Sequence, residues 1–181
     1  MIDTSKVPSL QEVSSTSREM LENVQQKLGM VPNLYATIGY SSSALKAMLE
    51  TETTLTKDAS FSAKEREAIN LIVSQVNNCD YCLAAHTALA KMRGFSEADT
   101  LSIRAANYND AKLKLVLQLA ASIAENKGNG DTDLKQAFFD AGYDEKALVE
   151  LIALIALRSF TNYVFSNTKV PVDFPAAAPL N

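Results

Sequence analysis

Both cysteines and the only histidine of this 181-residue chain fall within eight consecutive positions. Cys79 and Cys82 form a C-x-x-C pair, and His86 follows the second cysteine by four residues. Each residue of an α-helix turns by about 100°, so a helix through this segment places the three side chains on one face. The thiolate is the nucleophilic form of cysteine, and a nearby imidazole can accept the thiol proton. The segment therefore predicts one site for thiol redox chemistry, in which the two sulfurs can close into a disulfide.

Two physical effects compete over which cysteine is the nucleophile. Cys79 lies at the expected start of the helix, where the macrodipole and unpaired N–H groups lower the pKa of a thiol. Cys82 has His86 one turn away, at the spacing expected for direct proton transfer. The residues alone leave this choice open.

An imidazole is a better base when a carboxylate orients it and stabilises its cation. The preceding helix offers Glu65 and Glu67. Glu65 fits a capping box with Ser62, which already explains its presence. Glu67 lies on the opposite face of that helix, where a second buried surface is expected. Periodicity does not decide between the two carboxylates.

Composition limits the class of protein. The chain has 17 Lys and Arg against 21 Asp and Glu, a net charge of −4, and no basic cluster interleaved with aromatic residues, so nucleic-acid binding is disfavoured. The N-terminus lacks the pattern of a signal peptide, and no apolar run approaches the ~18 residues of a membrane span. We expect a cytoplasmic protein without membrane contact. In a reducing compartment, a C-x-x-C pair is more often catalytic or metal-binding than structural.

Apolar residues recur at helical spacing through most of the chain, and strand-like alternation is nearly absent. We therefore predict an all-α fold in one domain over residues 1–181, with a flexible N-terminus and an extended C-terminal tail from Val170. The expected helices are Ser17–Leu28, a short turn from Pro32, Ser42 to Thr56, Ser62–Val76, the C-x-x-C helix to Arg93, Ser96–Ala106, Ala111–Asn126, Thr132–Ala141 and Asp144–Thr168.

Two of these helices, over residues 111–121 and 148–157, are apolar around most of their circumference. Little of either helix should face water. We expect a homo-oligomer that covers these faces, and the alternative is a central core helix in a monomer.

The candidate site residues and several other segments of the chain resemble a known family. One pattern of spacing is similar to the active-site signature of the alkylhydroperoxidase D and carboxymuconolactone decarboxylase superfamily. In this pattern Glu67 is followed, after eleven residues, by Cys79-x-x-Cys82 and then by His86. Four further segments resemble its peroxidase-related branch, and the likeness spans about residues 25 to 175. These segments are Gly29-Met-Val-Pro-Asn-Leu-Tyr, Lys91-Met-Arg-Gly-Phe, Thr161-Asn-Tyr and Val172-Asp-Phe-Pro.

The resemblance implies an all-α protein, usually a trimer or a trimer-based hexamer, that reduces organic hydroperoxides without a metal or a bound prosthetic group. It implies that Cys82 is the peroxidatic thiol, that His86 and Glu67 relay its proton, and that Cys79 resolves the sulfenic acid into a disulfide. A dithiol donor, for example a lipoyl-bearing protein, then reduces that disulfide. One position departs from the family: Tyr81 stands where its best-known members have a second histidine. We expect Tyr81 to pack rather than to act in the site.

Four other interpretations compete with this one. The cysteines and His86 could be inert core residues, or they could bind zinc with water as the fourth ligand. The chain could be a decarboxylase of the same superfamily, although those members lack the cysteine pair. It could also be a non-catalytic oxidant sensor or structural oligomer, which would form the disulfide without sustained turnover.

Overall fold

The computed structural model describes residues 4–180, and within them the chain forms nine α-helices and no strand. The predicted all-α fold is confirmed. The helices are α1 (Ser15–Leu28), α2 (Asn33–Ile38), α3 (Ser42–Thr54), α4 (Ala63–Val76), α5 (Asp80–Met92), α6 (Glu97–Arg104), α7 (Ala111–Glu125), α8 (Thr132–Asp140) and α9 (Glu145–Thr168). The expected flexible N-terminus includes residues 1–3, which lie outside the described residues.

Local capping chemistry determines where several helices begin. The Ser62 side chain accepts a hydrogen bond from the Glu65 N–H, and the Glu65 carboxylate accepts one from the Ser62 N–H, so the predicted capping box is confirmed. The expected start of the first helix at Ser17 is wrong by two residues. Ser14 is the cap, and its hydroxyl oxygen accepts the Ser17 N–H at 3.1 Å. Several serines in this segment can cap a helix, and the sequence does not rank them.

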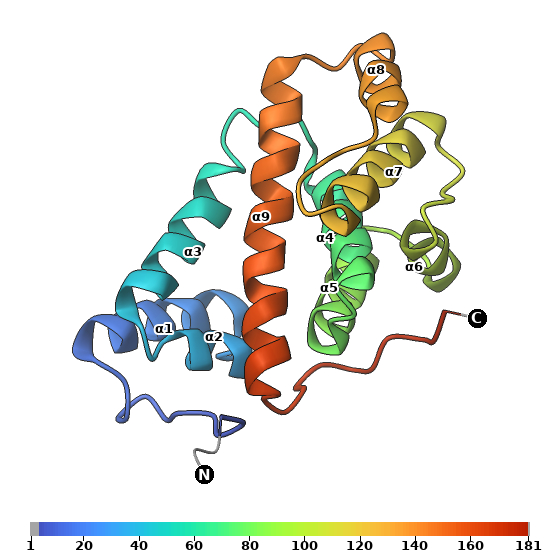
Figure 1. Cartoon of the computed structure of the whole chain (residues 1–181). Helices are drawn as coiled ribbons and strands as arrows, with labels where there is room; N and C mark the ends of the chain where they lie inside the picture. The colour runs from blue at the N-terminus through green and yellow to red at the C-terminus, as the bar shows by residue number, and fades with distance from the viewer. Residues whose placement is uncertain (1–3, 181) are drawn as a thin grey trace.

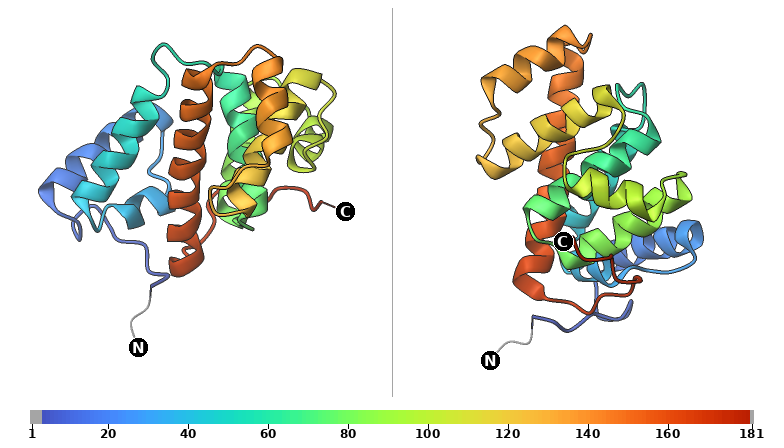
Figure 2. Two further views of the ribbon diagram at one scale, coloured as in Figure 1. Left: turned by 45° about the horizontal axis from the view of Figure 1, so that its top comes forward. Right: turned by 90° about the vertical axis from the view of Figure 1, so that its right-hand side faces the viewer.

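Helix α9 runs through the middle of the molecule and separates two groups of helices (Figures 1 and 2). Helices α1 to α3 lie on one side of it, and α4 to α8 lie on the other. Helix α4 contacts α5, α6, α7 and α9, and α2 and α3 also contact α9. Side chains on different faces of α9 therefore meet both groups.

Buried apolar side chains form two clusters that correspond to this layout. The larger one surrounds α4 and α7, where Ile69, Leu71 and Leu117 are fully buried. The smaller one joins α1, α2 and α3 to α5 and α9, and both cysteines belong to it. The reactive sulfurs consequently lie in an apolar environment between the two groups of helices.

Residues 169–180 form no helix and run along α5 (Figure 2). Asp173 accepts hydrogen bonds from the Tyr81 hydroxyl at 2.5 Å and from the Asn33 N–H at 2.8 Å. Further along, Arg104 donates to the carbonyl oxygen of Ala178. These bonds fasten the tail to α2, α5 and α6.

The two strongly apolar helices differ in burial. Within a single chain α7 packs in the larger core cluster, whereas α9 leaves Val149 66% exposed, Ile152 45% exposed and Tyr163 57% exposed. Among the described helices, α9 is also the one that is long and apolar enough to cross a membrane by length and composition. Within the described residues, 39% of its apolar window is buried.

Candidate functional site

Helix α4 supplies the carboxylate of the site. Glu65 is occupied by the capping box at the first turn, and Glu67 lies two residues later on another face of the helix. The Oε2 atom of Glu67 lies 2.8 Å from Nδ1 of His86 on α5. The carboxylate that pairs with the histidine is therefore Glu67, and the choice that periodicity left open is decided by the packing of α4 on α5.

The two cysteines occupy different positions at the start of α5. Cys79 is the N-cap residue with extended backbone angles, and its sulfur accepts a hydrogen bond from the Cys82 N–H at 3.3 Å. Cys82 lies inside the first turn. The exposed fractions of the two residues are 1% and 2%, and both are free thiols. The capping bond holds the two residues together at one buried location.

The two thiols differ in acidity in a direction that the helix dipole alone does not predict. A hydrogen bond from Cys79 is the largest cause that lowers the pKa of Cys82, against the opposing effect of burial. The charge of Arg158 and the polar side chains of Asn162 and Thr161 lower this pKa further. The pKa of Cys79 is raised, first by its hydrogen bond to Cys82 and then by burial. Cys82 is therefore the more acidic of the two thiols.

Glu67 and His86 form a buried pair with Asn70. Burial would raise the pKa of Glu67, but hydrogen bonding and charge from His86, followed by Arg158 and Asn70, lower it overall. The pKa of His86 is lowered by burial and by the charge of Arg158, although Glu67 opposes this. A neutral imidazole with its hydrogen on Nδ1 donates to the ionised Glu67, which leaves Nε2 able to accept a proton.

No hydrogen bond joins the Cys82 sulfur to His86 among the described residues. The two residues lie one turn apart on α5, but the imidazole is engaged by Glu67 on α4. The expectation of direct proton transfer is therefore not met in this arrangement.

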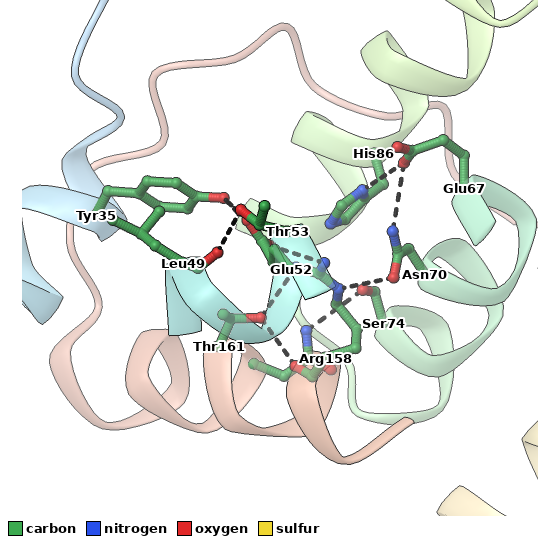
Figure 3. Close-up of polar contacts among 11 residues, drawn as sticks. Tyr35, Leu49, Glu52, Thr53, Glu67, Asn70, Ser74, His86, Arg158 and Thr161 are labelled. Atoms are coloured by element: carbon green, nitrogen blue, oxygen red, sulfur yellow. Dashed lines mark hydrogen bonds and ion pairs between the residues drawn. The ribbon is translucent and has the colours of Figure 1, made fainter. Parts of the chain in front are cut away.

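Arg158 on α9 is a central residue of the site that the sequence reasoning missed (Figure 3). It is 6% exposed, its Nε–H donates to the side-chain oxygen of Asn70 at 3.1 Å, and its Nη1–H donates to Thr161 at 3.1 Å. Its Nη2 atom lies 3.6 Å from the carboxylate of Glu52 on α3. One available signal was that this arginine directly follows a seven-residue apolar run, residues 151–157.

A tyrosine extends this charged network towards α2. The Tyr35 hydroxyl donates to the Glu52 carboxylate at about 3.1 Å (Figure 3). Burial, followed by the charge of Glu52, raises the pKa of Tyr35, so its hydroxyl stays protonated. Tyr35 and Glu52 were also missed, because neither lies near the C-x-x-C segment in the sequence.

Tyr81, between the two cysteines, packs as expected and also forms polar contacts. Its ring meets Phe165 and Phe174, and its hydroxyl accepts the Leu34 N–H and donates to Asp173. The phenol therefore fastens the tail and α2 to the residue between the sulfurs.

No group of three or more His, Cys, Asp or Glu side chains in residues 4–180 is arranged to hold a metal ion.

A model of the carboxymuconolactone decarboxylase family matches residues 43–108, a range that contains Glu67, both cysteines and His86. The uncharacterized protein YdfG of Bacillus subtilis strain 168 is 30% identical over 114 residues, which cover 61% of this chain and 77% of that protein.

Two solved structures share the fold at low identity. One is an alkylhydroperoxidase AhpD core, an uncharacterized peroxidase-related protein from Ralstonia eutropha JMP134, with a TM-score of 0.83, 20% identity, and coverage of 96% of this chain and 93% of that one. The other is a cysteine-to-alanine variant of the debrominase Bmp8 in complex with 2,3,4-tribromopyrrole, with a TM-score of 0.73, 18% identity, and coverage of 86% and 84%. The chain therefore belongs to the carboxymuconolactone decarboxylase family, and its fold is that of the AhpD core structure.

Proposed function

We propose that this protein is a thiol-dependent peroxidase that reduces organic hydroperoxides through a cycle of the Cys79–Cys82 dithiol and disulfide. The observation that carries the proposal is the pairing of the two buried cysteines at the start of α5, on the helix whose His86 meets Glu67. Cys82 has a pKa of about 7, and a protonated Cys79 is hydrogen-bonded to it. At neutral pH this pair presents a thiolate nucleophile together with a thiol that can resolve its product.

In the first step, the Cys82 thiolate attacks one oxygen of the hydroperoxide and the O–O bond breaks. The sulfur is oxidised to sulfenic acid, and the alkoxide leaves. The proton released by Cys82 passes through water or the peroxide to His86, whose cation is stabilised by Glu67. The same relay returns a proton to the alkoxide, and the products are a sulfenic acid and an alcohol.

In the second step, the sulfur of Cys79 attacks the sulfenic sulfur of Cys82. The S–O bond breaks, the Cys79 proton leaves with the hydroxide as water, and a disulfide forms. A dithiol donor, such as a lipoyl-bearing protein, reduces this disulfide and is itself oxidised to a cyclic disulfide. The cycle uses no metal or bound prosthetic group.

The proposal is tested on the fully reduced protein by adding one equivalent of cumene hydroperoxide, alkylating the remaining thiols and measuring mass. Both thiols should disappear together, with a Cys79–Cys82 disulfide in their place, faster than the thiols of glutathione at the same pH. The Cys82→Ser variant is the control and should not react. If both thiols survive while glutathione is oxidised, the proposal is wrong.

Sustained turnover separates an enzyme from an oxidant sensor. With excess hydroperoxide and dihydrolipoamide, an enzyme should produce many equivalents of alcohol per protein chain. A sensor would form one disulfide and stop. The family name and the structural neighbour supply two further assays, which are decarboxylation of a lactone acid and release of bromide from a brominated pyrrole.

We further propose that the protein is a cytoplasmic homo-oligomer, a trimer or hexamer, in which α9 contributes to the subunit contact. Helix α9 leaves apolar surface exposed at four residues, which are separated by three, eight and three positions. These residues are Val149, Ile152, Phe160 and Tyr163. An apolar stripe on an isolated chain supports contact with another copy.

A further inference from the structure

We propose that Arg158 is a positioning residue for the dithiol site: it holds the Asn70–Glu67–His86 chain in place and supplies the positive charge that favours the Cys82 thiolate. In the same proposal, the carboxylate of Glu52 determines how far that positive charge is neutralised at the sulfur. The inference rests on the proposed thiol chemistry at Cys82 and adds α9 and α3 to the parts of the fold that control it.

The positioning role follows from a continuous set of contacts (Figure 3). The Nε–H of Arg158 donates to the oxygen of Asn70 at 3.1 Å, and the Asn70 amide in turn lies 3.5 Å from Oε2 of Glu67. That same Oε2 atom meets Nδ1 of His86 at 2.8 Å. Because Arg158 occupies the amide oxygen, it orients the amide nitrogen of Asn70 towards the carboxylate.

The charge of Arg158 acts on two carboxylates, Glu52 directly and Glu67 through Asn70. Its nearest carboxylate is that of Glu52, at 3.6 Å, and Glu52 keeps 29% of its side chain exposed to water. Water screens the charge of Glu52 more than that of the arginine, whose side chain is 7% exposed. The field of the guanidinium is therefore shared between Glu52 and, through Asn70, the ionised Glu67, and at the Cys82 sulfur the charge of Arg158 favours the thiolate.

Two groups of the site respond to this field. The positive charge of Arg158 adds to the hydrogen bond from Cys79 in lowering the pKa of Cys82, and after burial it is the next cause that lowers the pKa of His86. One cation therefore favours both a thiolate nucleophile and a neutral imidazole that can accept a proton. The other titratable or charged groups around the sulfurs are Cys79, Tyr81 and Asp173 beside α5, Glu67 on α4, Glu52 on α3 and Tyr35 on α2.

The test is the pKa of Cys82 in the full-length reduced protein, measured from the pH dependence of its alkylation by iodoacetamide with site-resolved mass spectrometry. Arg158→Met should raise this pKa by about one unit, which lowers the alkylation rate at pH 7 about fivefold if only the thiolate reacts. Glu52→Gln should lower the pKa, because the arginine loses its counter-charge. A purely structural role predicts no such opposite shifts.

Lys146→Met is the matched control, since it removes one positive charge from the same helix at a half-exposed position that pairs with Asp58 and Glu150. It should leave the pKa of Cys82 unchanged. Equal pKa values in the wild type, Arg158→Met and Glu52→Gln proteins would overturn the inference, and so would shifts of the same sign in both variants.

Arg158→Met removes a buried charge, and circular dichroism will show whether it folds. If it does not fold, the pKa of Cys82 in the Glu52→Gln and Arg158→Lys variants tests the inference instead. Arg158→Lys keeps the charge but loses the planar fork to Asn70 and Thr161, so the pKa of Cys82 should stay within about half a unit of the wild type while peroxide reduction slows. A raised pKa in Arg158→Lys, or an unchanged one in Glu52→Gln, would overturn the inference. Since alkylation needs no peroxide, these results are independent of whether the peroxidase proposal holds.

Discussion

The carboxylate of Glu67 lies 2.8 Å from the imidazole of His86, across two helices that pack against each other. This contact separates Glu67 from Glu65, which is two residues earlier on α4 and is bonded to the backbone of Ser62. The pairing gives His86 a partner that fixes its tautomer. It also provides the most direct test of the proton relay.

Glu67→Gln should reduce the rate of peroxide reduction about 100-fold, because the amide does not stabilise the imidazolium of His86 as a carboxylate does. Folding should be retained, since glutamine can still accept the hydrogen bond from Nδ1. Glu65→Gln is the control and should lower stability by about 1 kcal/mol or less through the weakened cap, with no change in rate. Equal rates in the two variants would remove Glu67 from the mechanism. The measurement is stopped-flow oxidation of the reduced protein.

Cys79→Ala should raise the pKa of Cys82 above about 7, because the alanine removes the largest cause of its acidity. Cys79→Ser should raise it less, since serine keeps a donor that can reach the sulfur. In both variants the thiolate is present above the Cys82 pKa and is lost as the pH falls through it. The pH profile of Cys82 alkylation measures this order, and a lower pKa in the alanine variant would contradict it.

Stability should fall on acidification from pH 7 towards pH 4. The pKa of His86 is lowered from 6.5, so the unfolded chain binds more protons at this residue and stability is lost as the pH drops below 6.5. The pKa of Glu67 is lowered from 4.5, so its contribution is present above 4.5 and is lost as the pH falls further. Urea unfolding at several pH values measures the combined effect of His86 and Glu67 on the free energy of unfolding. A midpoint that rises on acidification would contradict both assignments.

Tyr81→Phe should loosen the C-terminal tail. It leaves Asp173 and the Leu34 N–H without the hydroxyl, a loss of about 1–3 kcal/mol for buried polar groups. Hydrogen exchange should become faster in residues 170–178 before the rest of the fold is affected. Tyr40→Phe is the matched control, because Tyr40 is 59% exposed and lies outside the tail contacts. Equal exchange in the tail of both variants would show that Tyr81 does not fasten it.

The apolar stripe of α9 should hold copies of the chain together. Ile152→Lys, at a residue that is 45% exposed, should shift the mass in light scattering towards that of the monomer without loss of helix content. Ser166→Lys is the control, because it places the same charge at an exposed polar position of the same helix. A wild-type protein that is already monomeric would show that α9 does not mediate assembly.

Much of the local structure was predictable from the sequence, because its causes are local. The capping serines, the glycine after α1 and the helical spacing of apolar residues placed the helices to within one or two residues at most ends. The crowding of Cys79, Cys82 and His86 on α5 predicted the site for the same reason. Spacing along one helix determines which side chains start close together.

The tertiary structure decided everything that depends on contacts between helices. It selected Glu67 over Glu65 and turned the imidazole towards α4 instead of Cys82. It also brought Arg158, 76 residues beyond Cys82 in the chain, into the site with Glu52. Periodicity identifies the face of a helix but not the partner that covers it, and the acidity of a buried thiol depends on that partner's charge.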